Sequence, residues 1–448
     1  MGLYENLFYS KAVNELYGDS LQVGYMLRFE AALAKAQAKL GLIPASSALL
    51  IEKSCDVNKI DIALLKQQIA LSGNAAIPLV KQLTQIVDEA DADASGYVHF
   101  GATSQDVIDT ATVLQLSDAL KLIRDDLDTL TRQLVLLVEE HRDTIMIGRT
   151  FLQHARPITF GFKVAGWLDG MLRSKKRIEN LLAENLALQL GGAVGTLSGM
   201  DDKGILIAEE MCSQLGLNMP LIQWHTQRDR LVEIASALGI LTGNIGKIGN
   251  DISLLMQTEV GEVFEPLAAG KGSSSTMPHK RNPVSSIICL AIAQRVPPLV
   301  SGLFTGMVQE HERGTGNWHA EWETMETIVK LTAGALHQAL IVTNGLEVDS
   351  ERMLINLEFT NGLIFAESVS LALAGKMNRT EAHELVEQCC VKAKDEGRHL
   401  KAVVMEDPAV NTILSQHQVD KIFDPGNSLG LCSEFINRVL NNARLNKN

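Results

Sequence analysis

The feature that most constrains the fold of this chain is a long heptad pattern that begins at residue 113. Apolar side chains recur there at alternating steps of three and four residues for more than three heptads. This spacing predicts a helix whose apolar seam packs against other helices. The seam is formed by Val113, Leu116, Leu120, Ile123, Leu127, Leu130, Leu134 and Leu137. Because an α-helix rises 1.5 Å per residue, this run predicts a helix of about 37 Å.

A second run repeats the pattern between residues 231 and 255. Its seam is formed by Leu231, Ile234, Leu238, Leu241, Ile245, Ile248, Ile252 and Leu255. Glycines at positions 239, 243, 246 and 249 lie along the same predicted helix. Since glycine weakens a helix, they indicate close approach of neighbouring backbones. Both helices are also apolar or small on other faces, so each needs partners on more than one side. We infer a bundle of long helices that continues across subunits.

The rest of the chain also has a helical pattern. The stretches 158–190 and 284–345 are typical of further long helices, and the two ends of the chain of shorter ones. Alternation with a period of two residues, the pattern of a strand, is rare. We therefore predict an all-α fold of three helical domains. These are an N-terminal domain over residues 1–110, a long central helix bundle over 111–360 and a C-terminal domain over 361–448.

Composition argues against several classes of protein. The formal net charge of −13 disfavours binding to nucleic acid and to anionic membranes, which requires a basic face. No uninterrupted run of about 18 apolar residues is present, so we expect no membrane-spanning helix. The opening segment lacks the basic and apolar regions of a signal peptide, and the 6 cysteines are scattered. Together these features predict a cytoplasmic protein with reduced thiols.

Two motifs that suggest a cofactor or a metal are incomplete. The segment GKGSSS at residues 270–275 resembles a phosphate-binding loop, but Glu265 stands where the first glycine belongs. The segment HERGT at residues 311–315 lacks the second histidine of a zinc-binding helix motif. We therefore expect neither a metal nor another cofactor.

The segment GSSSTMPHKRNP, residues 272–283, interrupts the helical pattern. Its glycine, serines and prolines predict an irregular loop. Chemically, it combines serine hydroxyls, which become bases once a proton is lost, with the cation of Lys280 and the amide of Asn282. The latter two groups can hold a carboxylate. A solvated basic loop between helices is an equally good interpretation of these residues alone.

Three segments resemble a known family. The run SSTMPHKRNP, residues 274–283, resembles the signature SSxMPxKxNP of the class II fumarase/aspartase superfamily. HFGATSQDVIDTA (residues 99–111) resembles its first conserved region and GRTFLQHARPITFG (residues 148–161) its second, in the expected order. The resemblance covers nearly the whole chain. It implies a fumarase/aspartase-like helical fold and a homotetramer whose central helices share one bundle. Each active site would gather residues from three subunits.

The resemblance implies roles for individual positions. Ser274 matches the catalytic base, while Lys280 and Asn282 match residues that hold the substrate carboxylate and the developing aci-carboxylate. Prearranged donors and a cation stabilise such a dianionic intermediate. Serine is a poor base unless its surroundings are positive, which Lys280 supplies here. The match also implies substrate binding by His99, Thr103, Ser104, Thr150, Gln153, Gln227, Ser275 and Met277.

The second region departs from the pattern of adenylosuccinate lyases, which read RTHGQPA there. Phe151 stands in the place of the histidine that serves as general acid, and His154 stands in the place of the proline. A phenylalanine cannot donate a proton, so the leaving group must not need one. A carboxylate does not, because its conjugate acid has a pKa of about 4. This points to lactone chemistry. For His154, a catalytic role, a carboxylate-binding role and a packing role all remain open.

Within the superfamily the chain resembles most the lactonising branch, the bacterial carboxymuconate cycloisomerases. The match extends through WHTQRDRLVEIASALG (residues 224–239) and LLMQTEVGEV (residues 254–263). It implies an intramolecular lyase that converts 3-carboxy-cis,cis-muconate to a carboxymuconolactone in the protocatechuate branch of the β-ketoadipate pathway. A small tricarboxylate substrate needs a locally cationic pocket, for which Arg228, Arg281 and Arg313 are candidates.

Two other interpretations stay open. An adenylosuccinate lyase would need histidine at position 151 and an SHSS-like segment after HER, where this chain has GTGNWHAEW. A non-catalytic relative, as lens crystallins are, would not need Ser274, Lys280 and Asn282. The residues therefore favour the cycloisomerase over both.

Overall fold

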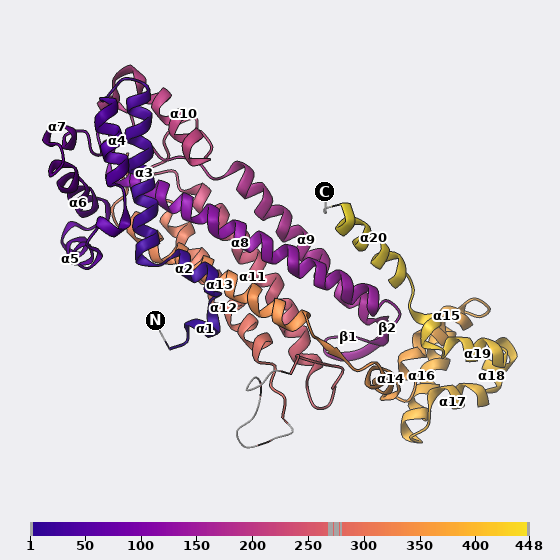
Figure 1. Cartoon of the computed structure of the whole chain (residues 1–448). Coiled ribbons are helices and arrows are strands. Elements are labelled where there is room, and N and C mark those ends of the chain that lie inside the picture. The colour runs from indigo at the N-terminus through magenta and orange to yellow at the C-terminus, as the bar shows by residue number, and fades with distance from the viewer. Residues whose placement is uncertain (1–2, 268–271, 273–276, 278–279, 446–448) are drawn as a thin grey trace. The chain divides into compact units, whose positions relative to one another are not determined.

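The computed structural model of the chain, shown in Figure 1, describes residues 3–267, 272, 277 and 280–445. These residues are mostly helical, so the predicted all-α class is confirmed. Two small antiparallel sheets accompany the helices in the described residues. They pair β1 (Ile145–Thr150) with β2 (Gln153–Thr159), and β3 (Val263–Phe264) with β4 (Glu347–Val348).

Both predicted seams lie on long helices. They belong to α8 (Ser104–Glu140) and α11 (Asp229–Leu255), and every residue of the two seams is buried. Three further long helices are α9 (Phe160–Glu184), α12 (Val284–Gly306) and α13 (Gly316–Thr343). The heptad pattern thus predicted the helices and the face that each of the first two buries.

Two predicted helix boundaries were wrong. The helix expected over 284–345 is two helices, because residues 307–315 leave the helical conformation and His311 adopts a φ of 46°. The helix expected over 158–190 begins two residues later and ends six residues earlier, since β2 occupies its start. Residues 309–317 contain two glycines and no apolar side chain, so the sequence does carry a signal for the first of these interruptions.

Shorter helices make up the rest of the described chain. Those before α8 are α1 (Glu5–Phe8), α2 (Lys11–Leu16), α3 (Asp19–Lys39), α4 (Ala45–Ser54), α5 (Ile62–Ser72), α6 (Ala76–Asp88) and α7 (Ala92–Ser95). Between α9 and α11 lies α10 (Gly204–Leu215). Those after α13 are α14 (Ser350–Glu358), α15 (Ala366–Ala374), α16 (Arg379–Asp395), α17 (Leu400–Glu406), α18 (Pro408–Ile413), α19 (Gln416–Ile422) and α20 (Cys432–Leu445). Single 3₁₀ turns cover Val57–Lys59, Leu363–Phe365 and Pro425–Ser428, and a longer 3₁₀ segment, Ser198–Lys203, is kinked at Met200 and Asp201.

The chain divides into two compact units. Unit 1 comprises Met1–Asp128, Arg173–Gly246 and Ile288–His337. Unit 2 comprises Thr129–Leu172, Lys247–Ile287 and Gln338–Asn448. Each of the five long helices contributes residues to both units. The three-domain division proposed from the sequence remains a prediction.

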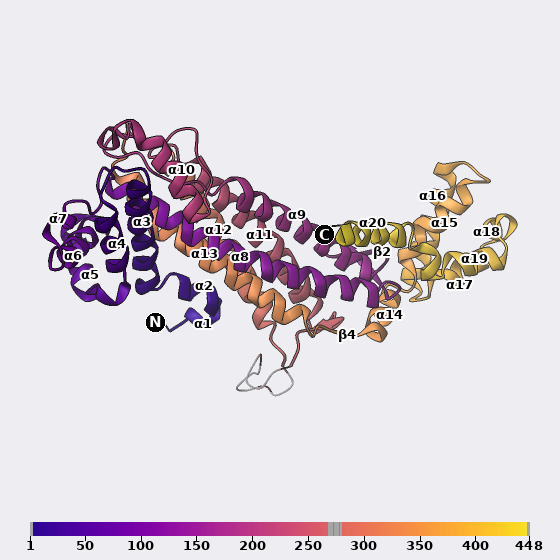
Figure 2. The ribbon, with the colours of Figure 1, turned by 45° about the horizontal axis from the view of Figure 1, so that its top comes forward.

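Within unit 1, parts of the long helices lie side by side, as Figures 1 and 2 show. Two of the predicted glycines bring α11 close to α12. A methyl group on Gly246 would lie 2.5 Å from Ala293 Cβ, and one on Gly239 would lie 3.3 Å from Val300 Cγ2. The expected close approach is therefore confirmed at these two positions. A methyl group on Gly243 would meet no atom within 4 Å apart from the neighbouring backbone of its own helix.

Unit 2 has an apolar core of its own. It is formed mainly by the helices that follow α13, with Phe365, Val369, Leu400 and Val404 among its buried side chains. Ile147 of strand β1 belongs to the same cluster. This contact anchors the β1–β2 hairpin to the C-terminal helices, so the position of the second conserved region depends on that core.

Two described helices are long and apolar enough to cross a membrane by length and composition alone. They are α11 and α12, and a bent pair, α14 with Leu363–Ala374, would make a third. Counting uninterrupted apolar runs missed α12 because Gln294 and Arg295 interrupt it. In the most apolar 18-residue segment of each helix, the chain itself buries 61% of α11 but only 33% of α12.

Candidate active site

The start of α8 in unit 1 is organised around one buried carboxylate. Asp106 is 0% exposed. Its Oδ2 accepts hydrogen bonds from the backbone N–H groups of Thr103 at 3.0 Å and Gly192 at 2.9 Å. Its Oδ1 accepts from the N–H of Gly191 at 3.0 Å and lies 2.7 Å from His225 Nε2. Asp106 therefore ties the first conserved region to two distant segments of the chain.

This arrangement has a local origin and a tertiary one. Thr103 precedes the first helical residue, and an acidic side chain three residues later can reach back to cap its N–H. Gly191 is required because a methyl group there would lie 2.8 Å from His225 Cε1. Gly192 adopts a φ of 70°, which other residues rarely adopt. The sequence therefore contains the signal for the cap, whereas nothing in it indicates His225 as a partner of Asp106.

Arg228 forms a second buried network in unit 1. It is 2% exposed, and its guanidinium contacts two carboxylates. It donates to Asp109 at 2.7 and 3.0 Å and to Glu321 at 2.7, 3.0 and 3.1 Å. Trp318 Nε1 also donates to Asp109, at 3.0 Å. Burial raises the pKa of Glu321 more than Arg228 lowers it. With its donors occupied inside the chain, Arg228 is not placed for the substrate contact expected from the sequence. The geometry instead gives it a structural role.

His99 is paired with a buried acid. Its Nδ1 lies 2.7 Å from Oε1 of Glu30, which is 1% exposed. Burial lowers the pKa of His99, but the charge and hydrogen bond of Glu30 outweigh it, so the pKa is raised overall. The protonated form of His99 is therefore more favoured than that of a free histidine. Such a cation suits a site for a carboxylate substrate.

Arg313 completes this part of unit 1. It donates from Nη1 to Thr103 Oγ1 at 3.2 Å and from Nη2 to the carbonyl of Ala193 at 2.9 Å. The structure thus brings the predicted residues Thr103 and Arg313 together, with Ser104 next in the chain. Gln227 is exposed and directly precedes buried Arg228.

The second conserved region lies in unit 2 on the β1–β2 hairpin. Phe151 and Leu152 form its two-residue turn, at φ values of 50° and 63°. Left-handed conformations at both turn positions suit a tight hairpin, but neither residue favours them. Phe151 is 100% exposed, and Thr150 and Gln153 pair across the base of the turn. Because the turn contains neither glycine nor asparagine, the sequence did not predict the hairpin.

His154 lies opposite Arg149 in this hairpin. Its ring is 5.7 Å from that of Phe359, and its Nδ1 is buried without a hydrogen-bond partner. Burial, followed by the charge of Arg149, lowers the pKa of His154. Arg149 donates to both oxygens of the buried Glu262, at 2.7 and 2.9 Å. The pair makes Arg149 a brace of the hairpin and leaves His154 as a neutral imidazole.

The predicted catalytic loop is only partly described. Ser274 and Ser275 lie outside the described residues, whereas Met277 and Lys280 are described and exposed. Arg281 donates to both oxygens of Glu347 at 2.9 Å and to the carbonyl of Glu265 at 2.7 Å. This contact ties the end of the loop to β4, and the substrate contact expected of Arg281 remains a prediction.

Asn282 and Glu265 hold the base of the loop. The backbone N–H of Asn282 donates to the carbonyl of Gly272 at 3.0 Å. Glu265 accepts from the N–H groups of Ser285 at 3.2 Å and Ser286 at 2.7 Å at the start of α12. These contacts hold the described ends of the loop to the start of α12 and to each other. Among the described residues, no group of three or more His, Cys, Asp or Glu side chains is placed to hold a metal ion.

Family models match most of the chain. A model described as "Lyase" matches residues 9–297, and one described as "Adenylosuccinate lyase C-terminus" matches residues 362–439. The two matches together include the three conserved regions and the C-terminal helices up to α20.

Named relatives match along the whole chain. The 3-carboxy-cis,cis-muconate cycloisomerase of Pseudomonas aeruginosa is 49% identical over 98% of this chain and 95% of its own length. That of Acinetobacter baylyi is 48% identical over 99% of this chain and 98% of its own length. The crystal structure of 3-carboxy-cis,cis-muconate lactonizing enzyme from Pseudomonas putida superposes with a TM-score of 0.95 at 47% identity, covering 100% of both chains. Likeness of this extent in sequence and fold confirms the predicted resemblance, and the chain belongs to the lyase family of the fumarase/aspartase superfamily.

Proposed function

We propose that this chain is a lactonising cycloisomerase that converts 3-carboxy-cis,cis-muconate to a carboxymuconolactone. In this reaction a carboxylate oxygen of the substrate adds to a carbon–carbon double bond, and the adjacent carbon takes up a proton. The observation that carries the proposal is Phe151 at the exposed hairpin turn. A benzyl side chain supplies no proton, and an intramolecular carboxylate needs none in either direction. The full-length relatives with this activity support the same reaction.

The proposed roles of the loop residues follow the family motif. Ser274 delivers the proton to carbon in the lactonising direction and removes it in reverse. Lys280 and Asn282 stabilise the carboxylate next to the reacting carbon, where negative charge develops. The exposure of Lys280 and the anchored base of the loop are compatible with that task. Ser275 and Met277 contact the substrate from the same loop.

The carboxylate-binding positions of unit 1 rest on more geometry. Thr103 is held through its backbone by Asp106 and through its hydroxyl by Arg313. Together with Ser104 at the N-terminus of α8, these groups offer donors to an anion. His99 adds positive charge through its raised pKa. Thr150, Gln153 and Gln227 are exposed side chains available to the remaining carboxylates.

For His154 the packing role is the best supported of the three open roles. Its lowered pKa and its contact with Phe359 favour a neutral ring held in place. A neutral imidazole is a weak proton donor to a leaving group. The lactonising reaction does not require that donor.

We further propose that the enzyme is a cytoplasmic homotetramer with active sites shared between subunits, without nucleic acid or membrane partners. The support is the apolar surface of α12, of which the chain itself buries only a third in the most apolar window. Other copies of the chain can cover this surface, as the superfamily resemblance implies. The net charge of −13 opposes contact with anionic lipid or nucleic acid.

The alternative activity is that of an adenylosuccinate lyase, which the match of residues 362–439 favours. Against it stand the phenylalanine at position 151 and the segment after HER. A shared C-terminal domain does not determine which group leaves.

A direct assay separates the two activities. Purified protein is mixed with 3-carboxy-cis,cis-muconate, and the loss of diene absorbance is followed; adenylosuccinate is tested in parallel. We expect turnover of the muconate alone. We expect Ser274→Ala to lower kcat by about 10³-fold, with assembly unchanged, and Ser273→Ala to remain close to wild type. Turnover of adenylosuccinate without turnover of the muconate would refute the proposed reaction. Near-wild-type activity of Ser274→Ala would exclude that serine as the base.

A further inference from the structure

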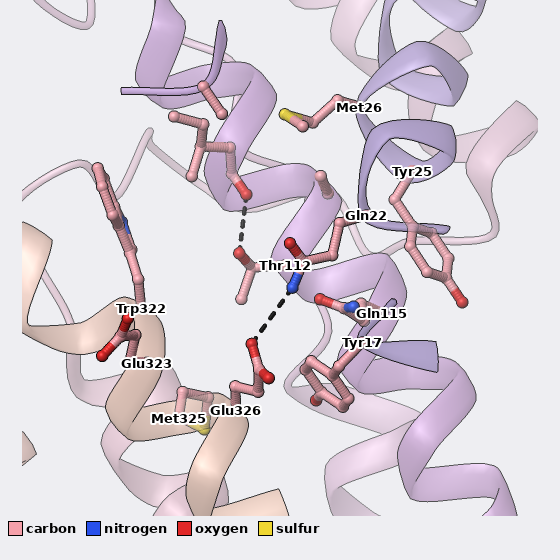
Figure 3. A pocket seen from close by; sticks show the side chains of 13 residues that line it. Tyr17, Gln22, Tyr25, Met26, Thr112, Gln115, Trp322, Glu323, Met325 and Glu326 are labelled. Atoms are coloured by element: carbon pink, nitrogen blue, oxygen red, sulfur yellow. Dashed lines mark hydrogen bonds between the residues drawn. The ribbon is translucent and has the colours of Figure 1, made fainter. Parts of the chain in front are cut away.

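Unit 1 contains a cavity of about 280 Å³ that the proposed reaction does not use (Figure 3). Its wall is formed by Tyr17, which follows α2, and by side chains of α3, α8 and α13. None of the residues proposed above for catalysis or substrate binding lines it. The side chains that meet there come from parts of the sequence more than 300 residues apart, as the bond between Gln22 and Glu326 shows.

Two polar atoms in the cavity wall have no partner. Tyr17 Oη and Trp322 Nε1 are buried and make no hydrogen bond. A buried polar group without a partner costs about 1–3 kcal/mol. Trp322 packs edge-on against Trp318, with ring centroids 5.0 Å apart, so its N–H group is held in place. A ligand that satisfies these atoms would therefore gain binding energy without first ordering the protein.

The charge of the wall selects the kind of ligand. Glu323 and Glu326 line the cavity, and no Lys, Arg or His is among its described lining residues. A tricarboxylate and its lactone are therefore disfavoured. The carboxylate of Glu326 accepts from Gln22 at 3.2 Å and from Lys330 at 3.2 Å. Because Lys330 balances the charge of Glu326 and Glu323 is exposed to solvent, the cavity suits a neutral molecule better than a cation.

The size and lining of the cavity indicate an aromatic molecule. An apolar cavity of about 150 Å³ holds benzene, so this larger cavity accommodates one ring with small substituents. Met26 and Met325 lie in the wall, and thioethers make favourable contacts with aromatic rings. Burial, followed by the charge of Glu326, raises the pKa of Tyr17, so its phenol remains protonated and can both donate and accept.

We propose that this cavity binds an uncharged monocyclic aromatic molecule that carries hydroxyl groups. An oxygen of the ligand accepts a hydrogen bond from Trp322 Nε1, and Tyr17 Oη is the second polar contact. The proposal concerns a site outside the proposed reaction and does not depend on which reaction the enzyme catalyses.

Calorimetry on the full-length protein without substrate tests this site. The probes are 4-hydroxybenzyl alcohol, 4-methylphenol with one hydroxyl fewer, and 4-hydroxybenzoate with an added negative charge. We expect saturable binding of 4-hydroxybenzyl alcohol at one molecule per chain and weaker binding of 4-methylphenol. Any binding of 4-hydroxybenzoate should be unaffected by replacement of Trp322. Trp322→Phe and Tyr17→Phe should each lower the affinity for 4-hydroxybenzyl alcohol about 5- to 10-fold, since each removes one hydrogen bond.

Trp167→Phe is the matched control. It also removes an indole N–H, but one that already donates to Asp251 in unit 2, so the affinity for the alcohol should not change. Circular dichroism and assembly state are compared for all three variants. Tyr17→Phe changes a single atom, which keeps the test available if Trp322→Phe does not fold. The proposal is overturned if the alcohol does not bind saturably or if the folded variants bind it as tightly as the wild type. Equal affinity for the benzoate through Trp322 would overturn it as well.

Discussion

In unit 1 the partly exposed candidate residues Thr103 and Ser104 lie against a buried network around Asp106, whereas at the hairpin turn and loop of unit 2 the candidate residues Thr150, Gln153 and Lys280 are exposed. Asp106 and His225 are each 0% exposed, and their contacts lie within the same unit. Phe151, by contrast, is 100% exposed, and Met277 is 43% exposed. The network around Asp106 is formed within unit 1, whereas the hairpin turn and the loop of unit 2 expose their side chains.

The difference separates residues that hold a site from residues that contact a ligand. Two arginines illustrate it, since both were expected to bind substrate. In unit 1, Arg228 is enclosed by two carboxylates, and in unit 2, Arg281 is half-buried against Glu347. Positive charge in the sequence therefore does not by itself distinguish a structural ion pair from a ligand contact. Burial and saturation of donors are what distinguish them.

Replacement of Arg228 should give the largest effect. Arg228→Met leaves Asp109 and Glu321 buried without their cation, so we expect the free energy of unfolding to fall by about 3–5 kcal/mol. Arg281→Met is the matched control, because that ion pair is partly exposed; its loss should be about 1 kcal/mol. Urea unfolding at neutral pH measures both. Equal losses would contradict the division into a buried and an exposed region.

The loss in Arg228→Met should also shrink as the pH falls. Burial already raises the pKa of Glu321, and without Arg228 the carboxylate takes up a proton more readily. The variant then regains stability relative to the wild type on the acid side. A loss that is the same at all pH values would argue that packing, rather than unpaired charge, accounts for it.

Asp106→Asn should have an intermediate effect. The amide N–H groups of the new asparagine would face the backbone N–H groups of Thr103, Gly191 and Gly192, which need an acceptor. We therefore expect the free energy of unfolding to fall by about 2 kcal/mol. If Thr103 binds the substrate, KM should rise about tenfold, with a smaller change in kcat. The control is Asp125→Asn on the same helix, where the side chain is 61% exposed. An unchanged KM in Asp106→Asn would show that Asp106 does not support substrate binding. The loss of stability would then test its structural role alone.

The two histidines should give the smallest effects, of opposite sign with pH. The raised pKa of His99 means that its contribution is present below the ordinary value of about 6.5 and is lost as pH rises through the folded pKa. The lowered pKa of His154 means that its contribution is present above about 6.5 and is lost as pH falls through the folded pKa. His99→Gln should therefore lower the free energy of unfolding most below about pH 6.5, and His154→Gln should lower it most above about pH 6.5. Unfolding series across pH test this, and parallel profiles would refute the assigned partners.

Much of the fold was predictable because its signals are local. The heptad spacing of α8 and α11 predicted the buried faces of two long helices. The hairpin and the break between α12 and α13 were not predictable in this way. The hairpin turn uses residues that rarely adopt its conformation. The break is marked by the run at residues 309–317, which contains two glycines and no apolar side chain, and not by a heptad signal.

The residues of the candidate site were predictable, but their hydrogen-bond and ion-pair partners were not. The motifs around Thr103 and Lys280 indicated a carboxylate-binding lyase before any geometry was known. The partners that hold those residues lie far away in the sequence: Asp106 meets His225 across 119 residues, and Arg228 meets Glu321 across 93. No periodicity links residues at such separations.

The sequence by itself determined that this is a bundle of long helices from the fumarase/aspartase superfamily, and that position 151 cannot donate a proton. Both conclusions depend on residue identity and short-range spacing. Only the tertiary structure decided which charges are free. Arg228 became a buried brace, His99 a favoured cation and His154 a neutral ring because of the carboxylates, rings and solvent that the folded chain places around them. Charge state and availability depend on that three-dimensional environment, which a one-dimensional pattern does not contain.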